Sequence, residues 1–331
     1  MKLKPISFIL LAGLMGYVGY WYFLSLNTDI YLEKMAERLA QQGAAFEYAS
    51  YEVSGFPYRL VLTFENPVFK FQNGPLEIVV NSTKMDVIAQ PWNLSHIIFF
   101  PEDTEIQLSY AAQEMTLKPE HLGFSFHDLG GDRYRLSSEF TGVEISSNLE
   151  TGVPVKLDTM AFHLRKEIQE IQEAEGLFEP KLLELGLSGT RGKEFSFEVT
   201  SSFRGQEVPE MTRPALEVWR NHGGTFEIDK LQISQFGQTF EGAGSFTLDN
   251  QFRPLGVFSI EGASPKEILK FFTANRWIGE TDAVLVGSFI DTLPKDANGN
   301  DFIFPLAFSI QEGFLTLGPA RLKEIGPIIP E

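Results

Sequence analysis

The chain has 331 residues, a formal net charge of -17 and no cysteine. The negative charge argues against a nucleic-acid partner, because a phosphate backbone would be repelled, and against a body lying flat on anionic lipid. The lack of cysteine excludes disulfides, thiolate metal sites and cysteine nucleophiles. The 30 phenylalanines favour either a sheet-rich fold or an apolar groove for lipid.

The residues from Ile6 to Leu26 carry no charged side chain. As a helix rising about 1.5 Å per residue, this run is long enough to cross a hydrocarbon core of about 30 Å. Lys2 and Lys4 precede it, so the positive-inside tendency places Met1 in the cytoplasm. The sequence predicts a cytoplasmic N-terminus at residues 1–5 and a transmembrane anchor at residues 6–26. The anchor residues include Ile6, Phe8, Leu10, Leu14, Trp21 and Leu26.

A cleaved signal peptide is the competing interpretation of this run. The apolar region of a signal peptide is usually about 7–15 residues long, and this run is longer. It also ends in aromatic residues that suit a lipid–water interface, namely Tyr17, Tyr20, Trp21, Tyr22 and Phe23. The sequence therefore favours an uncleaved anchor, with the rest of the chain outside the cytoplasm.

Residues 27–43 are predicted to form a helical stalk. Ile30, Leu32, Met35 and Leu39 recur close to helical spacing, and Gly43 suits the end of a helix. The stalk would connect the anchor to the body.

Residues 44–331 are predicted to form a β-rich body, because the hydrophobic period changes to two after Phe46. Apolar residues alternate with polar ones in many short runs, separated by turn-forming residues such as Asn73-Gly74-Pro75. The spacing leaves no room for crossover helices between most neighbours, so the strands should form mainly an antiparallel meander. The expected fold is mainly β with a few helices, in which the transmembrane helix precedes an antiparallel curved sheet or sheet sandwich.

Three helices are expected within the body, at about Met211–Gly224, Ser264–Ala274 and Thr281–Leu293. Pro214 suits the first turn of the first, and Ser264 with Glu267 forms a capping box at the start of the second. A charged segment within residues 165–180 marks a seam between two halves. The body is expected to end in a hairpin formed by Phe302–Ile310 and Leu315–Leu317.

The search for catalytic or metal-binding residues is negative. There is no His-Glu-x-x-His pair and no Gly-x-Ser-x-Gly elbow. His121 and His127 would share a face only within a single strand, and nothing nearby completes a set of three ligands. Gly192-Lys193 lacks the rest of a phosphate loop, and Asp296 begins a run that lacks the glycine and the last glutamate of a calcium loop. We expect no catalytic residue, no metal site, no cofactor and no enzyme activity.

Several motifs of glycine, proline and aromatic residues stand out: the anchor followed by Val53-Ser54-Gly55-Phe56-Pro57-Tyr58-Arg59-Leu60; Trp219 with Gly223 and Gly224; Gly242-Ala243-Gly244-Ser245-Phe246-Thr247-Leu248-Asp249; Arg253-Pro254-Leu255-Gly256; and Phe304-Pro305-Leu306 with Leu317-Gly318-Pro319. Together they resemble the alphaproteobacterial family called domain of unknown function 2125. Glycine, proline and aromatic positions dominate these motifs, so their natural interpretation is architectural. Arg59 either pairs with an acidic group inside the sheet or lies in solvent at its edge, and the second is favoured.

The resemblance implies an envelope protein of Gram-negative bacteria, held in the inner membrane with its body in the periplasm, and it supplies no reaction. A more distant similarity of layout links it to AsmA-like envelope proteins, some of which are implicated in lipid traffic. That step is an analogy of fold.

Three functional hypotheses follow. The first is a non-enzymatic protein that binds or shields acyl chains of lipid or lipoprotein in envelope maintenance. The second is a structural or assembly factor that binds other envelope proteins. The third, which is remote, is an unrecognised hydrolase.

Overall fold

The computed structural model describes residues 3–131, 133–148, 154–166, 181–205, 210–235, 237–262, 264–274, 279–292, 305–317 and 320–329. Strands make up 58% and helices 22%, and the strands pair antiparallel in a sheet that does not close, which confirms the expected fold class. The chain divides into two compact units, Met1–Lys156 and Leu157–Glu331. Most of the expected seam at residues 165–180 lies outside the described residues.

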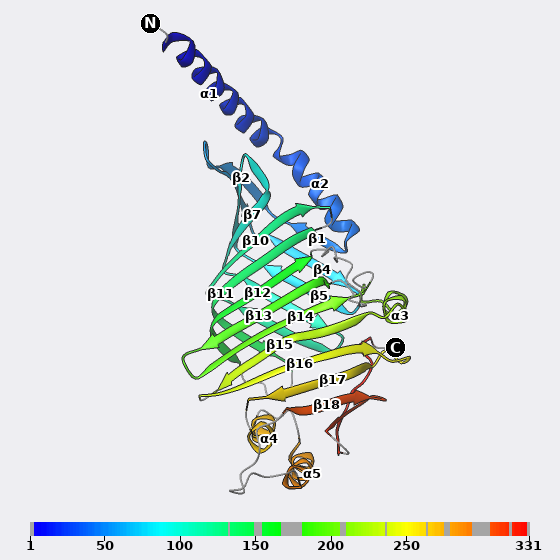
Figure 1. Ribbon diagram of the computed structural model, residues 1–331. Helices are drawn as coiled ribbons and strands as arrows, with labels where there is room; N and C mark the ends of the chain where they lie inside the picture. Colours follow the sequence, from blue (N-terminus) through cyan, green and yellow to red (C-terminus); the bar gives the residue numbers. More distant parts are fainter. Residues whose placement is uncertain are drawn as a thin grey trace. The chain divides into compact units, whose positions relative to one another are not determined.

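Unit 1 begins with helices α1 (Leu3–Leu26) and α2 (Thr28–Gln41). Within α1, the segment Phe8–Leu26 is long and apolar enough to cross a membrane. Helix α2 coincides with the expected helix at residues 27–43, and Gly43 after it has a positive φ of 74°. Figure 1 shows both helices in blue before the sheet.

The strands of unit 1 join end to end into long bent strands. They are β1 (Ala44–Glu47), β2 (Ser50–Ser54), β3 (Leu60–Glu65), β4 (Val68–Asn73), β5 (Leu76–Asn81), β6 (Lys84–Gln90), β7 (Asn93–Glu102), β8 (Glu105–Tyr110), β9 (Gln113–Lys118), β10 (His121–Gly130) and β11 (Arg133–Ser147). Five bent strands each consist of two consecutive strands: β1 with β2, β3 with β4, β5 with β6, β7 with β8, and β9 with β10. Strand β11 forms the sixth bent strand by itself. Each bent strand pairs with the next through both halves, so unit 1 is an antiparallel meander.

The bends lie side by side and form a line that we call the crease. Hydrogen bonds continue across it, from the Asn66 amide to the Thr83 carbonyl at 2.9 Å and from the Thr83 amide to the Glu102 carbonyl at 3.1 Å. Asn66, Asp103 and Gly142 have positive φ at three of the bends. Asparagine, aspartate and glycine tolerate this left-handed backbone best, which explains these residue types at the crease.

The crease divides the sheet of unit 1 into two leaves. The first leaf contains β2, β3, β6, β7, β10 and residues 133–141 of β11, and the second contains β1, β4, β5, β8, β9 and residues 144–147 of β11. The ring centroids of Phe46 on the second leaf and Phe64 on the first lie 5.1 Å apart across the crease. The two leaves therefore present these side chains to the same side.

Unit 2 is a meander in which each strand pairs with the next, as Figure 1 shows for β12 to β18. Its strands are β12 (Val155–Lys166), β13 (Lys181–Arg191), β14 (Phe195–Arg204), β15 (Thr225–Gln235), β16 (Gln238–Leu248), β17 (Pro254–Glu261), β18 (Leu306–Gln311), β19 (Phe314–Leu317) and β20 (Ala320–Glu324). Its helices are α3 (Arg213–Asn221), α4 (Pro265–Ala274) and α5 (Glu280–Asp291).

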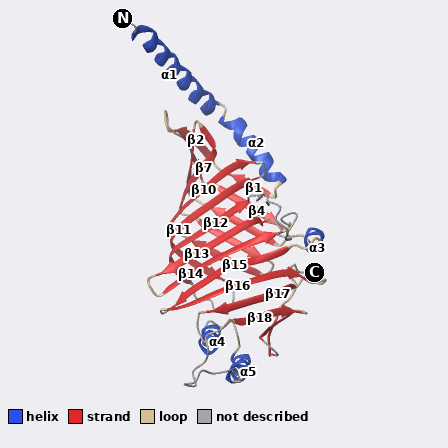
Figure 2. Cartoon of the chain, viewed as in Figure 1, coloured by secondary structure: helices blue, strands red, loops and turns tan. Residues whose placement is uncertain are grey.

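The helices of unit 2 cover apolar parts of its sheet, and Figure 2 shows α4 and α5 near β18. One core joins Ile268 of α4 and Val286 and Ile290 of α5 to Phe240, Ile260 and Phe308 of the sheet. The expected capping box is present: the Ser264 amide donates to Glu267 at 2.9 Å, and the Glu267 amide donates to the Ser264 hydroxyl at 3.4 Å.

The end of the body differs from the expected hairpin. Strands β18 and β19 pair as predicted, but β20 also pairs with β19. The body therefore ends in three antiparallel strands in place of a two-stranded hairpin. The charges of β20 concealed it, because Arg321, Lys323 and Glu324 are exposed while Leu322 is buried. Charged side chains are typical of an edge strand. Residues 302–304 of the expected strand lie outside the described residues.

Candidate functional site

The first leaf carries apolar side chains on one face, which we call its inner face. The strand register aligns a middle row formed by Leu62, Val87, Phe99, Phe124 and Ser138. A tip row, farther from the crease, is formed by Leu60, Ala89, Ile97, Phe126 and Leu136. A crease row, next to the bends, contains Phe64, Met85, Pro101, Leu122 and Phe140. These rows follow from the alternation of side chains along each strand.

The second leaf continues the same pattern beyond the crease. One row consists of Phe46, Phe69, Val80, Ile106, Leu117 and Ile145. The next consists of Ala44, Phe71, Ile78, Leu108 and Met115. With the Phe46–Phe64 ring contact, the rows of both leaves form one apolar surface, called the inner face of unit 1 from here on.

Burial on the inner face varies along the strands: Leu60 and Ala89 of the tip row are buried, as is Ala44 on the second leaf, whereas Leu62 and Val87 of the middle row are partly exposed. The crease row is buried, and Phe64 is only 2% exposed. Phe99 and Phe124 in the middle row are partly exposed, and Met115 on the second leaf is 38% exposed. Apart from the Ser138 hydroxyl, these rows hold no polar side-chain group. The chemistry available here is apolar contact, which stabilises a bound alkyl chain by about 0.8 kcal/mol per buried CH₂.

The opposite face of unit 1 mixes polar side chains with apolar ones such as Ile88, Ile98 and Phe100, of which Phe100 is 49% exposed. The Thr63 hydroxyl donates to Asp86 at 2.7 Å, and Lys118 pairs with Glu105 at 2.7 Å. The His96 and His127 rings are 5.3 Å apart across β7 and β10. Strand β10 contains both His121 and His127, whose even spacing puts them on one face. Within the described residues, no group of three or more His, Asp or Glu gathers as metal ligands.

The end of α1 contacts the hairpin that contains the first family motif (Figure 1). Trp21 and Leu24 are buried against Leu60, with Val53 and Leu62 beside them. The Trp21 indole N–H donates to the Arg59 carbonyl at 2.8 Å, and its ring meets Phe56 edge-on at 5.3 Å. The Arg59 side chain itself is exposed. Gly55 has a φ of 98°, and a Cβ there would lie 2.8 Å from the Arg59 carbonyl oxygen, so glycine is required at this close approach.

Helix α2 is joined to the sheet by a polar contact. The Tyr51 hydroxyl of β2 donates to the Asp29 carboxylate. Burial, followed by this hydrogen bond and the carboxylate charge, raises the pKa of Tyr51 to about 12. The contact fixes the start of α2 beside the first leaf.

The Gly242, Gly244 and Gly256 motif positions make room for phenylalanine rings. A Cβ on Gly244 would lie 2.8 Å from the Phe258 ring and 3.0 Å from the Phe246 ring. A Cβ on Gly242 would lie 3.0 Å from the Phe258 ring, and one on Gly256 would lie 2.8 Å from the Phe246 ring. These glycines therefore serve the packing of unit 2.

Trp219, Gly223 and Gly224 form one local structure at the end of α3. The Gly223 amide donates to the Arg220 carbonyl at 3.0 Å and the Gly224 amide to the Trp219 carbonyl at 2.9 Å, which is a Schellman ending. The Trp219 indole N–H donates to the Arg204 carbonyl at 3.0 Å. A Cβ on Gly224 would lie 2.3 Å from that indole nitrogen, so only glycine fits.

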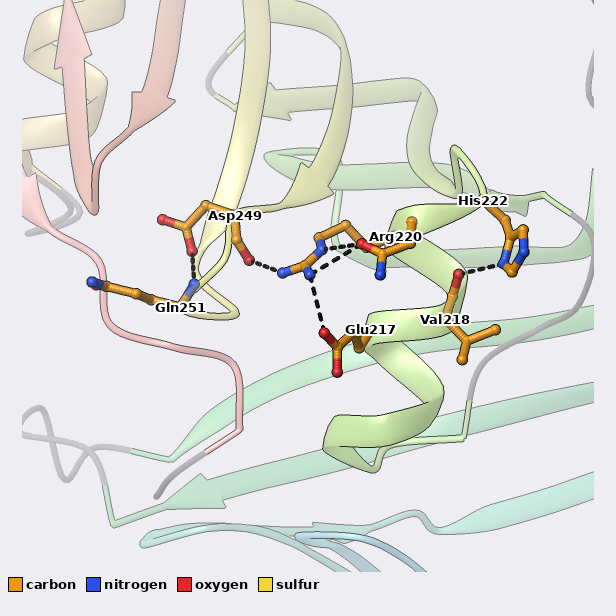
Figure 3. Close-up of polar contacts among 7 residues, drawn as sticks. Glu217, Val218, Arg220, His222, Asp249 and Gln251 are labelled. Atoms are coloured by element: carbon orange, nitrogen blue, oxygen red, sulfur yellow. Dashed lines mark hydrogen bonds and ion pairs between the residues drawn. The ribbon is translucent and has the colours of Figure 1, made fainter.

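Asp249 organises the turn before Pro254, shown in Figure 3. Its carboxylate accepts hydrogen bonds from the amides of Gln251 at 2.8 Å and Arg253 at 2.9 Å, and pairs with the Arg253 guanidinium at 2.7 Å. Its carbonyl accepts from Arg220 of α3 at 2.8 Å. Burial alone would raise the pKa of Asp249, but the hydrogen bonds from Arg253 and Gln251, together with the Arg253 charge, outweigh burial and lower that pKa.

The structure thus separates the motif residues into two groups. Gly55, Phe56, Pro57 and Arg59 lie against α1, and the motifs from Trp219 to Gly256 stabilise unit 2. Gly318 and Pro319 lie outside the described residues.

A shallow surface pocket of about 550 Å³ between α4 and α5 is lined by Leu269, Ala283 and Gly287 with Lys266 and Lys270. Sequence reasoning did not identify the inner face as a surface, although the alternation that produces it was visible.

Comparison with known proteins identifies one family. The family model described as "Uncharacterized protein conserved in bacteria (DUF2125)" matches residues 21–325. No curated protein and no solved structure matches the chain. The matched range begins at Trp21, the residue that packs against the first motif.

Proposed function

Since the chain belongs to the DUF2125 family of bacterial proteins, whose description names no activity, we propose from its own structure that it is a membrane-tethered, non-enzymatic protein that binds acyl chains. The chains would belong to lipid or lipoprotein and would lie on the inner face of unit 1. We place the anchor in the inner membrane of a Gram-negative bacterium and the body in the periplasm, where the protein would act in envelope maintenance.

The observation that carries this proposal is the partly exposed middle row of the inner face. Leu62, Val87, Phe99 and Phe124 are neighbours across four bent strands, and none of them is fully buried. A sheet normally covers its apolar face with another layer of structure. Contiguous apolar surface that is left accessible on a protein is typical of a binding site.

The anchor supports the choice of ligand. The Phe8–Leu26 segment is long and apolar enough to cross a bilayer, and its last turns pack on Leu60 in the tip row. The tip row would therefore lie close to the membrane surface, and the middle row follows it along the strands. Acyl chains are the apolar molecules most abundant at that position.

Photo-crosslinking of the full-length protein in nanodiscs tests this proposal. The probe is a fatty acid with a photoreactive group in its chain, and the adduct is mapped by mass spectrometry. We expect adducts on inner-face residues. Replacing Phe99 with serine, or filling the face by Val87→Trp, should reduce labelling.

The chain supplies matched controls for both variants. Phe100 and Ile88 are the sequence neighbours of Phe99 and Val87 and lie on the opposite face of the same strands. Phe100→Ser and Ile88→Trp should leave labelling unchanged. Equal labelling of all four variants, or adducts confined to the opposite face, would overturn the proposal. A stable protein crosslink in place of a lipid adduct would favour the assembly-factor hypothesis.

A further inference from the structure

Two hairpin tips of the first leaf contact the part of α1 that is long and apolar enough to cross a membrane. Residues 55–59 connect β2 to β3, and residues 91–92 connect β6 to β7. The Tyr17 hydroxyl donates to the Pro57 carbonyl, and the Tyr20 hydroxyl donates to the Pro91 carbonyl at 2.8 Å. Tyr17, Tyr20 and Trp21 are spaced three and four residues apart, so one side of the helix holds both tips.

The positions of these tyrosines set the depth of the tips. At about 1.5 Å per residue, Tyr17 and Tyr20 lie about 14 Å and 9 Å before Leu26, the end of the apolar segment. The headgroup region on each side of a bilayer is only about 5–8 Å thick, judged from the total and hydrocarbon thicknesses. These depths exceed the thickness of the headgroup region. If Phe8–Leu26 spans the bilayer, hairpin tips at the level of Tyr17 and Tyr20 therefore lie within the bilayer.

The side chains exposed at the tips suit a lipid interface. Tyr58 is 73% exposed, Trp92 is 60% exposed and Phe56 is 47% exposed. Aromatic side chains with a polar group are favoured where hydrocarbon meets headgroups.

The charge distribution agrees with this placement. In a chain of net charge -17, Arg59 is the only charged residue between Glu52 and Glu65. No aspartate, glutamate, lysine or arginine occurs between Asp86 and Glu102. The tips thus lack the acidic residues that would be repelled by anionic headgroups and costly to dehydrate.

The backbone polar groups of the tips are also partly satisfied without water. Unpaired backbone groups are costly away from water, and proline carries no N–H to satisfy. The carbonyls of Pro57, Arg59 and Pro91 accept hydrogen bonds from Tyr17, Trp21 and Tyr20. The helix therefore supplies partners that water would otherwise provide.

We propose that the tips at residues 55–59 and 91–92 insert Phe56, Tyr58 and Trp92 into the bilayer leaflet around the C-terminal end of α1. The body is then held to the membrane at two points besides the span, and the tip row of the inner face opens next to lipid. This proposal rests on the membrane anchor of the proposed function, but not on acyl-chain binding.

Site-directed spin labelling tests the insertion, because the chain has no native cysteine. Tyr58→Cys and Trp92→Cys place nitroxide labels on the tips of the full-length protein in nanodiscs of phosphatidylethanolamine and phosphatidylglycerol. Collision with oxygen, which dissolves in lipid, is compared with collision with a nickel chelate, which stays in water. Leu10→Cys reports on the middle of the span, and Ala112→Cys reports on an exposed turn at the other end of the bent strands.

We expect oxygen to be favoured at positions 58 and 92, to a degree between those at positions 10 and 112. Tip labels as accessible to nickel as the label at position 112, together with a buried label at position 10, would overturn the insertion and leave the anchor intact. A label at position 10 that nickel reaches freely would overturn the span and, with it, the insertion. Loss of fatty-acid labelling alone would contradict only the acyl-chain proposal.

Discussion

The rings of Phe99 and Phe124 stack 4.1 Å apart and within 5° of parallel at the centre of the inner face. They face each other directly across β7 and β10. Aromatic pairs contribute about 0.5–1.5 kcal/mol beyond their buried area. A double-mutant cycle of Phe99→Ala and Phe124→Ala, measured by denaturant unfolding in detergent, should give a coupling free energy in that range. Additive effects of the two changes would show that the stack contributes nothing of its own.

Trp21→Ala should destabilise the first leaf, because Trp21 is buried on Leu60 and its indole donates to Arg59. Truncating a buried tryptophan costs about 3–5 kcal/mol. Hydrogen exchange of β2 and β3 should accelerate accordingly. The control is Phe23→Ala, an exposed position on the same helix, which should leave exchange unchanged. Equal exchange in both variants would contradict the role of α1 as part of the body's core.

Gly244→Ala should destabilise unit 2, because the added Cβ would lie 2.8 Å from both the Val257 carbonyl oxygen and the Phe258 ring. Overpacking of this kind costs about 1–3 kcal/mol. Ala243→Ser, on the exposed side of the same strand, is the control and should change the free energy of unfolding by less than about 0.5 kcal/mol. A wild-type melting temperature for Gly244→Ala would show that the rings move aside freely.

Asp249→Asn should destabilise unit 2 in a pH-dependent way. The folded state lowers the pKa of Asp249, so its contribution is present above the unfolded pKa of about 3.9 and is lost as pH falls through the folded pKa. At neutral pH the loss should be about 1.5–3 kcal/mol, the range for hydrogen bonds to charged groups. Urea unfolding from pH 7 to pH 3 should show the difference from wild type shrinking at the acid end. A difference that stays constant would mean that the carboxylate charge is not what stabilises the turn.

Asp29→Asn should lower the pKa of Tyr51 from about 12, because it removes the anion that accepts the hydroxyl hydrogen bond. Burial would still hold that pKa above the ordinary value. Since the folded pKa is raised, the contribution of Tyr51 to stability is present below about pH 10 and is lost as pH rises through the folded value. Ultraviolet titration of tyrosinate compares the two proteins, with Tyr51→Phe identifying the signal. An unchanged titration would exclude the contact with α2.

Much of the fold follows from patterns visible in the sequence. The uncharged run predicts α1, the spacing of Ile30, Leu32 and Met35 predicts α2, and period-two alternation predicts the meander. The capping box at Ser264 and Glu267 predicts the start of α4. All of these signals are local, because each arises from neighbouring residues within one element.

The bent strands could not be predicted, because a bend and a tight turn look alike in sequence. Asn66 and Asp103 are typical turn residues, yet the chain continues through them into the other leaf of the same meander. Only the hydrogen-bond register shows that the apolar residues of both leaves share one surface.

The anchor contacts were also hidden, since they join distant parts of the chain. The aromatic end of α1 and the Gly55-Phe56-Pro57 motif each stood out, but nothing in the sequence indicates that Tyr17 bonds to Pro57 across 40 positions. The glycines at 242, 244 and 256 suggested architecture without naming the rings of Phe246 and Phe258 that require them.

The crease constrains how this sheet can change length during evolution. Each bent strand keeps its side chains in register on both sides of the bend, so a single residue inserted between bend and tip would turn the following side chains to the opposite face. Insertions are tolerated only beyond the last paired residue, at the hairpin tips. Homologues should therefore keep the number of residues between tip and crease, and any difference in length should fall at hairpin ends other than the motif tip at residues 55–59. A family alignment with leaves of constant length and gaps confined to those hairpin ends would agree with this constraint.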